Sequence, residues 1–346
     1  MVTAPAKPRV DWIDAVKGLT IILVVVKHAT YGTAAALDQI PYYFDLLCEW
    51  AVPFRMPLFF LVAGLFAQKA LRAPLRSFID SKILHFVYFY LLWSALQIGI
   101  KMVLPHGGGW SVSYLDFLLI PLEPFGLMWF IYALAVFFAF MRFARDVRPA
   151  IVITFALALY FTNLNTGWTM PDEFAHRFLF FTAGVYGAPY VFDAAQWAIN
   201  KPKRAALTGL LLLVVVAECV FTGKTDMRPV ELFTGIAGAA GTIMLVAIAA
   251  SRGYAKPLTY VGSRSLYVFL AFFLPMAVTR TVMIKLGITE GDVITLVTSL
   301  MAVGMPLIAY AALRHTPLAF FFERPDTLKL KENAQVSSAA LPAAQG

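Results

Sequence analysis

Charge is scarce in this chain of 346 residues. Only 14% of the residues are charged and 60% are hydrophobic, against roughly 25% and 45–50% in soluble domains. This composition excludes an ordinary soluble protein and predicts an all-α integral membrane protein with many spanning helices. The net charge of +8 does not indicate nucleic-acid binding, because the basic residues lie in short loops between apolar runs and form no single stripe with stacking aromatic residues.

Cysteine and histidine are also few. The two cysteines and five histidines are scattered, and no metal-ligand spacing joins them, so we expect no metal site. Cys48 and Cys219 both map near the predicted outer side of the membrane, where an oxidising compartment permits a disulfide. Two buried free thiols are the alternative that we favour. Gly107–Gly109 lack the strand and helix of a phosphate-binding loop and are interpreted as a flexible linker.

Long apolar runs follow one another along the chain. A spanning helix needs about 20 mostly apolar residues, and ten segments qualify or nearly qualify. They are residues 13–33, 53–71, 83–103, 124–142, 149–165, 176–195, 205–222, 231–250, 258–279 and 292–313. The first has the basic start and short apolar core of a secretory signal, but Lys27 and His28 interrupt it before any cleavage point, so we expect a retained helix.

The basic residues indicate how these helices are oriented. With the N-terminus inside, 19 Lys and Arg residues fall in cytoplasmic segments and six in outer ones, as the positive-inside bias requires. We therefore predict ten helices with both termini cytoplasmic. The chain then divides into a cytoplasmic N-terminal segment (1–12), a transmembrane domain (13–322) and a small, polar tail (323–346) that we expect to be disordered.

The first apolar segment contains an ionisable side chain that is costly to bury. His28 lies inside it, and such residues usually line a cavity or a reaction centre. Lys17 precedes His28 by eleven residues, close to three helical turns, so both point the same way about 16 Å apart, with Asp14 near that face. Lys27 points elsewhere and can snorkel outward. His28 is a candidate general base; a structural histidine bonded to a backbone carbonyl is the alternative.

Further polar residues extend this hypothesis. Arg55 opens the second predicted helix and could stabilise an oxyanion beside His28, or it could pair with Glu49 at the membrane interface. A cytoplasmic basic cluster includes Lys82 and His85, which share a helical face and could hold the phosphates of a donor such as an acyl-coenzyme A. Positive-inside anchoring alone is the alternative for this cluster. Glu218 could orient His28 or contact an acceptor, or it could be solvated.

Four motifs resemble, in order, those of the acyltransferase family 3 membrane proteins. The segment DWIDAVKGLTIILVVVKHA is similar to the family's opening. FRMPLFFLVAGLF, GLMWFIYAL and LTYVGSRSLYVFL are similar to its second-helix, Trp-Phe and Ser-Leu motifs. The residues that carry the resemblance are Asp14, Lys17, Gly18 and His28; Met56, Pro57, Phe59, Phe60 and Gly64; Trp129, Phe130 and Leu134; and Gly262, Ser265 and Leu266.

The resemblance implies an enzyme that transfers an acyl group, commonly acetyl or succinyl, from cytoplasmic acyl-coenzyme A to a sugar hydroxyl of an envelope polysaccharide, glycolipid or glucan. It makes His28 the catalytic residue. The reading of the residues themselves adds Arg55 as a second candidate catalytic residue. Asp14, Glu49, Glu218 and Trp129 are the candidate substrate-binding residues. We expect no permanently bound cofactor, and the bacterial inner membrane as the location.

The donor side departs from the family's pattern. The family has arginines where this chain has Lys17, Lys82 and His85, and Phe272 stands where the family often has a histidine. Lysine lacks the two-pronged contact that arginine makes with phosphate. Two other readings therefore stay open: a transporter or flippase for a glycolipid or small solute, and an inactive relative. The absence of an evident internal repeat disfavours the inverted-repeat transporters.

Overall fold

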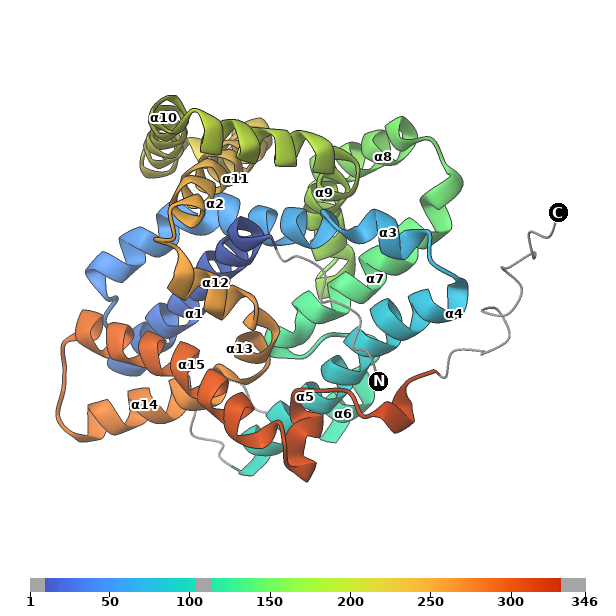
Figure 1. The fold of residues 1–346 in the computed structure, drawn as a ribbon. Coiled ribbons are helices and arrows are strands. Elements are labelled where there is room, and N and C mark those ends of the chain that lie inside the picture. Colours follow the sequence, from blue (N-terminus) through green and yellow to red (C-terminus); the bar gives the residue numbers. More distant parts are fainter. Residues whose placement is uncertain (1–9, 104–113, 331–346) are drawn as a thin grey trace.

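The computed structural model describes residues 10–103 and 114–330, and every regular element within them is helical (Figure 1). The all-α class is therefore confirmed for this part of the chain. The predicted N-terminal segment up to residue 9, the linker Gly107–Gly109 and the tail beyond residue 330 lie outside the described residues. The α-helices are α1 (Asp11–Leu37), α2 (Tyr42–Gly64), α3 (Ala67–Leu71), α4 (Leu75–Phe78), α5 (His85–Val103), α6 (Tyr114–Leu119), α7 (Trp129–Phe143), α8 (Pro149–Phe161), α9 (Thr169–Asn200), α10 (Pro202–Phe221), α11 (Arg228–Ser251), α12 (Lys256–Gly262), α13 (Ser265–Ala271), α14 (Phe273–Lys285) and α15 (Gly291–Leu313).

Short turns of tighter or wider pitch connect some of these helices. The tight 3-10 turns are η2 (Gly126–Met128), η3 (Ala144–Asp146), η4 (Lys224–Asp226), η5 (Pro317–Phe321) and η6 (Asp326–Leu328), and η1 (Ile79–Leu84) is a π-helical turn. Helix starts follow local chemistry: Pro149 and Pro202 open α8 and α10, because proline has no N–H to leave unbonded in a first turn.

Seven helical stretches of the described chain are long and apolar enough to cross a membrane, and eight if the bent pair α13 and α14 counts as one. The protein is thus an integral membrane protein. All ten predicted segments fall on helices, but α8 has only 13 residues, and α9, with 32 residues, is not among the apolar candidates. Ten spans and two cytoplasmic termini stay predictions.

The second span begins earlier than predicted. α2 starts at Tyr42, eleven residues before the predicted range 53–71. Pro53 and Pro57 lie inside the helix. Proline is typical of a first helical turn, so a helix that begins at Pro53 looks reasonable from the sequence, but α2 begins before it. As a consequence, Arg55 lies deep within α2 and is only 4% exposed. We had expected Arg55 to open the helix, and this expectation is wrong.

The predicted span 258–279 is not one straight helix. These residues form α12, α13 and the first part of α14, and the axes of α13 and α14 differ by 55°. Pro275 explains the break, because it cannot donate a hydrogen bond to Ala271, the last residue of α13, and its ring clashes with that carbonyl. Phe272 sits at the bend and is fully buried.

α1 lies inside the bundle. It packs against α2, α11, α12, α13 and α15, and Figure 1 shows α2, α12, α13 and α15 around it. α2 packs in turn against α9 and α11, and α7 packs against both α5 and α9. Since α1 and α2 carry His28 and Arg55, this arrangement places both residues in the interior of the protein.

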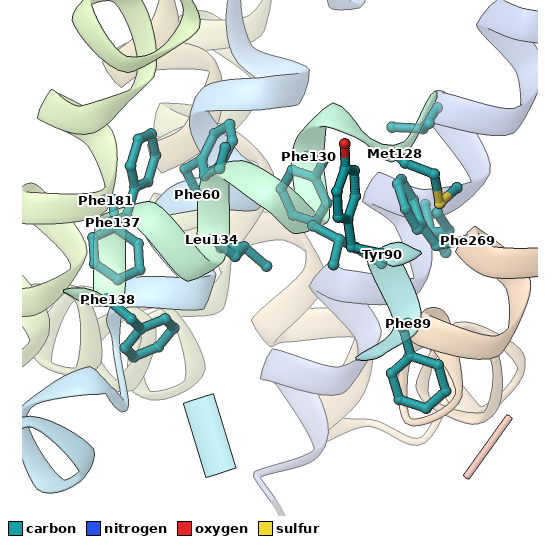
Figure 2. Close-up of a cluster of buried hydrophobic side chains, with 14 of the residues drawn as sticks. Phe60, Phe89, Tyr90, Met128, Phe130, Leu134, Phe137, Phe138, Phe181 and Phe269 are labelled. Atoms are coloured by element: carbon teal, nitrogen blue, oxygen red, sulfur yellow. The ribbon is translucent and has the colours of Figure 1, made fainter. Parts of the chain in front are cut away.

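Aromatic rings fill the space between α2, α5, α7 and α9 (Figure 2). Phe137 of α7 contacts Phe60, Phe178 and Phe181, with ring centroids 5.1 to 5.5 Å apart. These pairs are edge-on or tilted, which is the arrangement that the quadrupoles of aromatic rings favour. The rings hold α7 against α2 and α9 by close packing, which drives helix association where lipid replaces water.

Two pairs of glycines allow helices to cross in backbone contact. A Cβ atom built on Gly18 would lie 2.0 Å from the carbonyl oxygen of Leu258, and one on Gly262 would lie 1.6 Å from that of Asp14. The second pair, Gly64 of α2 and Gly184 of α9, crosses as closely. Small residues are what such close approach in membrane bundles requires, and α1 thereby meets α12 beside Lys17.

We expect Gly262→Ala to destabilise the bundle, because the added methyl group overlaps the backbone of α1. Overpacking of this kind costs about 1–3 kcal/mol, and thermal unfolding of the detergent-solubilised protein should show a lower midpoint. The matched control is Gly99→Ala in α5, where an added Cβ meets nothing within 4 Å. Equal midpoints for the two variants would contradict the close crossing.

The chain beyond α15 returns to the bundle. Arg324, whose side chain is 4% exposed, donates hydrogen bonds to the carboxylate and to the backbone carbonyl of Asp80, at 2.6 and 2.8 Å. The backbone N–H of Leu330 donates to the same carboxylate at 2.7 Å. Residues 323–330, which the sequence assigns to a disordered tail, are therefore held against η1.

We expect Asp80→Asn to release this segment, since removing one partner of a largely buried ion pair leaves the other charge uncompensated. Limited trypsin digestion should then cut at Lys329 faster than in the unmodified protein. Asp146→Asn removes a carboxylate from an exposed pair with Arg145 and should leave the cleavage rate unchanged. Equal rates for both variants would show that the ion pair does not hold the segment.

Candidate active site

One cavity in the bundle brings four charged side chains and His28 together, and we call it the histidine cavity. Its volume is about 240 Å³, and its walls come from α1, α2, η2, α7, α9, α13 and the bend at Phe272. The remaining wall is apolar and largely aromatic, as is usual for a small-molecule site. The polar and indole side chains of the cavity are those of Lys27, His28, Arg55, Trp129, Glu173 and Arg177.

His28 faces this cavity with its ring nitrogens available. Its ring lies against that of Phe272, with centroids 5.7 Å apart and planes tilted by 35°. Among the described residues, no hydrogen bond to the His28 ring is recorded. Phe272 stands where the resemblance leads us to expect a histidine, so His28 lies beside an apolar ring here, and its nitrogens can bond to a molecule in the cavity.

Arg55 reaches the same cavity from α2. The residue is buried, and its Nη1 atom has no hydrogen-bond partner within the described part of the chain. The suggested pairing with Glu49 is not found, because Glu49 is exposed on α2 and does not line the cavity. A buried guanidinium without a partner is costly, and this donor is free to act on a ligand.

Three charged residues of the cavity were missed by the sequence reasoning. Lys27 was expected to point away from His28, yet both line the cavity, because neighbouring residues of a helix can both border a wide opening. Glu173 and Arg177 of α9 form an ion pair at 3.0 Å and are not among the site residues predicted from the sequence. Their four-residue spacing on a helix was the signal that could have revealed the pair.

Lys17 and Lys82 line a second cavity of about 330 Å³, the lysine cavity. Asp14 accepts a hydrogen bond from the Lys17 ammonium at 3.2 Å, and the Lys82 ammonium lies 4.8 Å from the centre of the Phe138 ring. Gly262 and Ser265 of the fourth motif lie on its wall. The α1–α12 crossing thus brings the first and fourth motifs together.

Three phenylalanines separate the two cavities. Phe59, Phe130 and Phe269 line both of them. The centroid of Phe130 lies 4.5 Å from that of Phe59 and 5.4 Å from that of Phe269, and Figure 2 shows Phe130 and Phe269 among the side chains of the aromatic core. We call these three rings the aromatic partition. They come from α2, α7 and α13, so movement of any of these helices would alter the passage.

A third cavity, of about 800 Å³, adjoins the lysine cavity, and we call it the C-terminal cavity. Ser263 and Leu266 line both. It contains His85 together with Arg264, Arg324 and Lys329, and the last three were not proposed as site residues. Lys82 and His85 therefore face different cavities, because the π-helical turn η1 widens the helix between them; such turns are frequent at functional sites.

Of the four predicted substrate-binding residues, Trp129 lines the histidine cavity. Asp14, Glu49 and Glu218 do not. Glu218 is at the end of α10 with half of its side chain exposed, and it pairs with Lys224 at 2.5 Å. Asp14 borders a shallow cavity near the start of α1. Cys48 and Cys219 are free and buried, as expected.

The sequence comparisons agree with this geometry. The model of an acyltransferase domain matches residues 10–313. The chain belongs to acyltransferase family 3. A relative is the inner membrane protein YcfT of Escherichia coli (strain K12), 22% identical over 241 residues, which cover 62% of this chain and 66% of YcfT, just under two thirds of its length. No solved structure matches the chain.

Residues of the family's motifs line the histidine and lysine cavities. The four motifs fall on walls that the three-dimensional structure brings together: His28 and Trp129 on the histidine cavity, Lys17 and Ser265 on the lysine cavity, and Phe130 on the partition between them. Motifs that are far apart in the sequence therefore surround one continuous region of the bundle.

Proposed function

We propose that this protein is an integral membrane O-acyltransferase. It would move an acyl group, acetyl or succinyl, from acyl-coenzyme A to a hydroxyl of a cell-envelope carbohydrate or glycolipid, at the inner membrane. The observation that carries the proposal is the placement of two cavities side by side. His28 and the unpartnered Arg55 line one of them, and Lys17 and Lys82 line the other. The three rings of the aromatic partition lie between them.

The donor would enter from the cytoplasmic side. Lys17 and Lys82 offer ammonium groups to its phosphates, and the adjoining C-terminal cavity adds Arg264. Arg324 and Lys329 also line that cavity but are paired with Asp80 and Asp326. Arginine binds phosphate in a two-pronged geometry that lysine cannot reproduce. Arg264 would therefore compensate in part for the lysines that replace the family's arginines, and no permanently bound cofactor is needed.

The chemistry needs one base and one stabiliser of negative charge. His28 would take the proton from the acceptor hydroxyl while its oxygen attacks the thioester carbonyl. The tetrahedral intermediate carries its charge on the former carbonyl oxygen, where the free Nη1 of Arg55 would donate a hydrogen bond. Collapse of the intermediate breaks the carbon–sulfur bond, and the thiolate receives the proton from the His28 imidazolium.

The aromatic partition would keep the two substrates apart until they react. Phe59, Phe130 and Phe269 line both cavities, so the thioester end of the donor would have to pass these rings to reach His28. Rings in this position also limit entry of water, which would otherwise hydrolyse the thioester. The partition therefore suits an enzyme that joins substrates arriving from opposite sides.

A second function suits the same arrangement. Two cavities on either side of an aromatic partition are also what a carrier for a glycolipid or small solute requires, if the partition opens alternately. The unpartnered Arg55 and the free nitrogens of His28 favour the enzyme. They offer a stabiliser of negative charge and a general base, and transport needs neither. A transporter would move solute without consuming a thioester, and an inactive relative would do neither.

We expect His28→Ala to reduce acyl transfer by about 10²–10⁴-fold, the usual contribution of a general base. Release of free coenzyme A should be measured with the purified protein in lipid nanodiscs, acetyl- or succinyl-coenzyme A, and the glycan fraction of cells that lack the protein. The matched control is His315→Ala, an exposed histidine that should leave the rate unchanged. Full activity of the His28 variant in a well-folded sample would refute the mechanism.

Lys82 provides a test of the donor side. Lys82→Gln should raise the KM for acyl-coenzyme A about tenfold with little change in kcat, because it removes a charged hydrogen-bond donor to phosphate. Lys82→Arg should instead lower the KM, since it restores the two-pronged contact. Lys69→Gln removes an exposed cation of α3 as a control. A KM that does not respond to either Lys82 variant would exclude Lys82 from donor binding.

A further inference from the structure

The histidine cavity contains more positive charge than the proposed reaction uses. Lys27, Arg55 and Arg177 line it, and Glu173 is the one acidic residue among its lining residues. The Glu173–Arg177 ion pair at 3.0 Å satisfies one of the three cations. Two cations remain in a space of about 240 Å³, and a single arginine would be enough to stabilise an oxyanion.

The two remaining cations have no recorded protein partner. No hydrogen bond or ion pair of Lys27 or Arg55 appears among the described residues, and the buried Nη1 of Arg55 is unsatisfied. Charges inside a membrane protein are normally paired with one another or with a ligand. An anionic group in the cavity would supply the missing partner for both side chains.

We propose that the acceptor is anionic, and that its carboxylate or phosphate group binds between Lys27 and Arg55 while its hydroxyl faces His28. The Arg55 guanidinium has five N–H donors, so it can hold this group and still donate to the oxyanion. This inference rests on the proposed function and narrows its substrate class to acidic sugars or phosphate-bearing carbohydrate headgroups. The cavity is large enough for about one sugar ring. Trp129 and Phe130 provide apolar walls for the faces of that ring.

The anion also has a role in the chemistry. When His28 takes the proton of the acceptor hydroxyl, its imidazolium shares the cavity with Lys27, Arg55 and Arg177, while the matching negative charge moves to the attacking oxygen and then to the former carbonyl oxygen. Like charges repel strongly where water is scarce. A bound anion offsets the repulsion between the imidazolium and the other cations, whereas a neutral acceptor leaves Lys27 without a counter-charge.

The decisive measurement compares two sugars that differ at C6 alone, where one has a carboxylate and the other a hydroxymethyl group. D-glucuronate and D-glucose have the same ring, and their binding to the full-length protein in nanodiscs can be followed by saturation-transfer NMR without acyl-coenzyme A. Glucose 6-phosphate serves as the phosphate probe. We expect glucuronate or glucose 6-phosphate to bind at least about tenfold more tightly than glucose, with an affinity that falls as salt is added.

Substitutions in the histidine cavity test whether the tighter binding of anionic sugars depends on Lys27 and Arg55. Lys27→Gln and Arg55→Gln should each weaken binding of the anionic probe by about tenfold, while Arg55→Lys keeps the charge and should retain most of it. Lys285→Gln removes an exposed cation at the end of α14 and should have no effect. Equal binding of the charged and neutral sugars, no binding of either anionic probe, or unchanged binding by both glutamine variants overturns the proposal.

The activity assay shows whether the anionic group that binds the two cations belongs to the acceptor sugar or to the acyl group of the donor. Coenzyme A release is compared for acetyl- and succinyl-coenzyme A with glucuronate and with glucose. A preference for glucuronate with either donor supports the proposal. An Arg55-dependent preference for the succinyl donor with no preference between the sugars overturns it and assigns the cations to the acyl group.

The outcomes also distinguish this inference from the function on which it rests. Selective binding of glucuronate without coenzyme A release from any pair of substrates would refute the acyltransferase and leave the anion site in place. Coenzyme A release that is His28-dependent, with equal use of glucose and glucuronate, would support the enzyme and refute the anionic acceptor.

Discussion

The backbone crossing of α1 and α12 is the constraint on which the site depends. Gly18 and Gly262 let the two helices meet without intervening side chains, and this contact sets the position of α1 in the bundle. Lys17 is next to the crossing and His28 lies eleven residues further along the same helix. Since a helix is rigid over this length, fixing α1 at Gly18 also fixes both functional side chains relative to α7, α9 and α13.

Aromatic packing explains how so many charged groups persist in an apolar bundle. The charged residues lie on cavity walls, and the space between the cavities is filled by Phe59, Phe130 and Phe269. This distribution confines polar groups to regions that water or substrate can enter, which lowers the cost of burying them. The same rings separate a basic region suited to phosphates from one suited to acid–base chemistry.

Several features could be predicted because they depend on local patterns. Hydropathy identified the helical segments, and the spacing of Lys17 and His28 placed them on one face of α1. The start of α2 and the bend before Pro275 were missed, because proline at a helix start and proline inside a helix look the same in a hydropathy profile. Arg55 was therefore assigned to the membrane boundary, although it is buried inside the bundle.

The sequence by itself determined the all-α membrane class, the family motifs and the candidate role of His28, since these follow from composition and from spacing along one helix. Only the tertiary structure decided which charges share a cavity with His28. Arg177 and Glu173 of α9 join Lys27 of α1 and Arg55 of α2 there, while Glu49 and Glu218 remain outside. The reason is physical: periodicity defines a residue's face on its own helix, but crossing angles and side-chain packing between helices decide what that face meets.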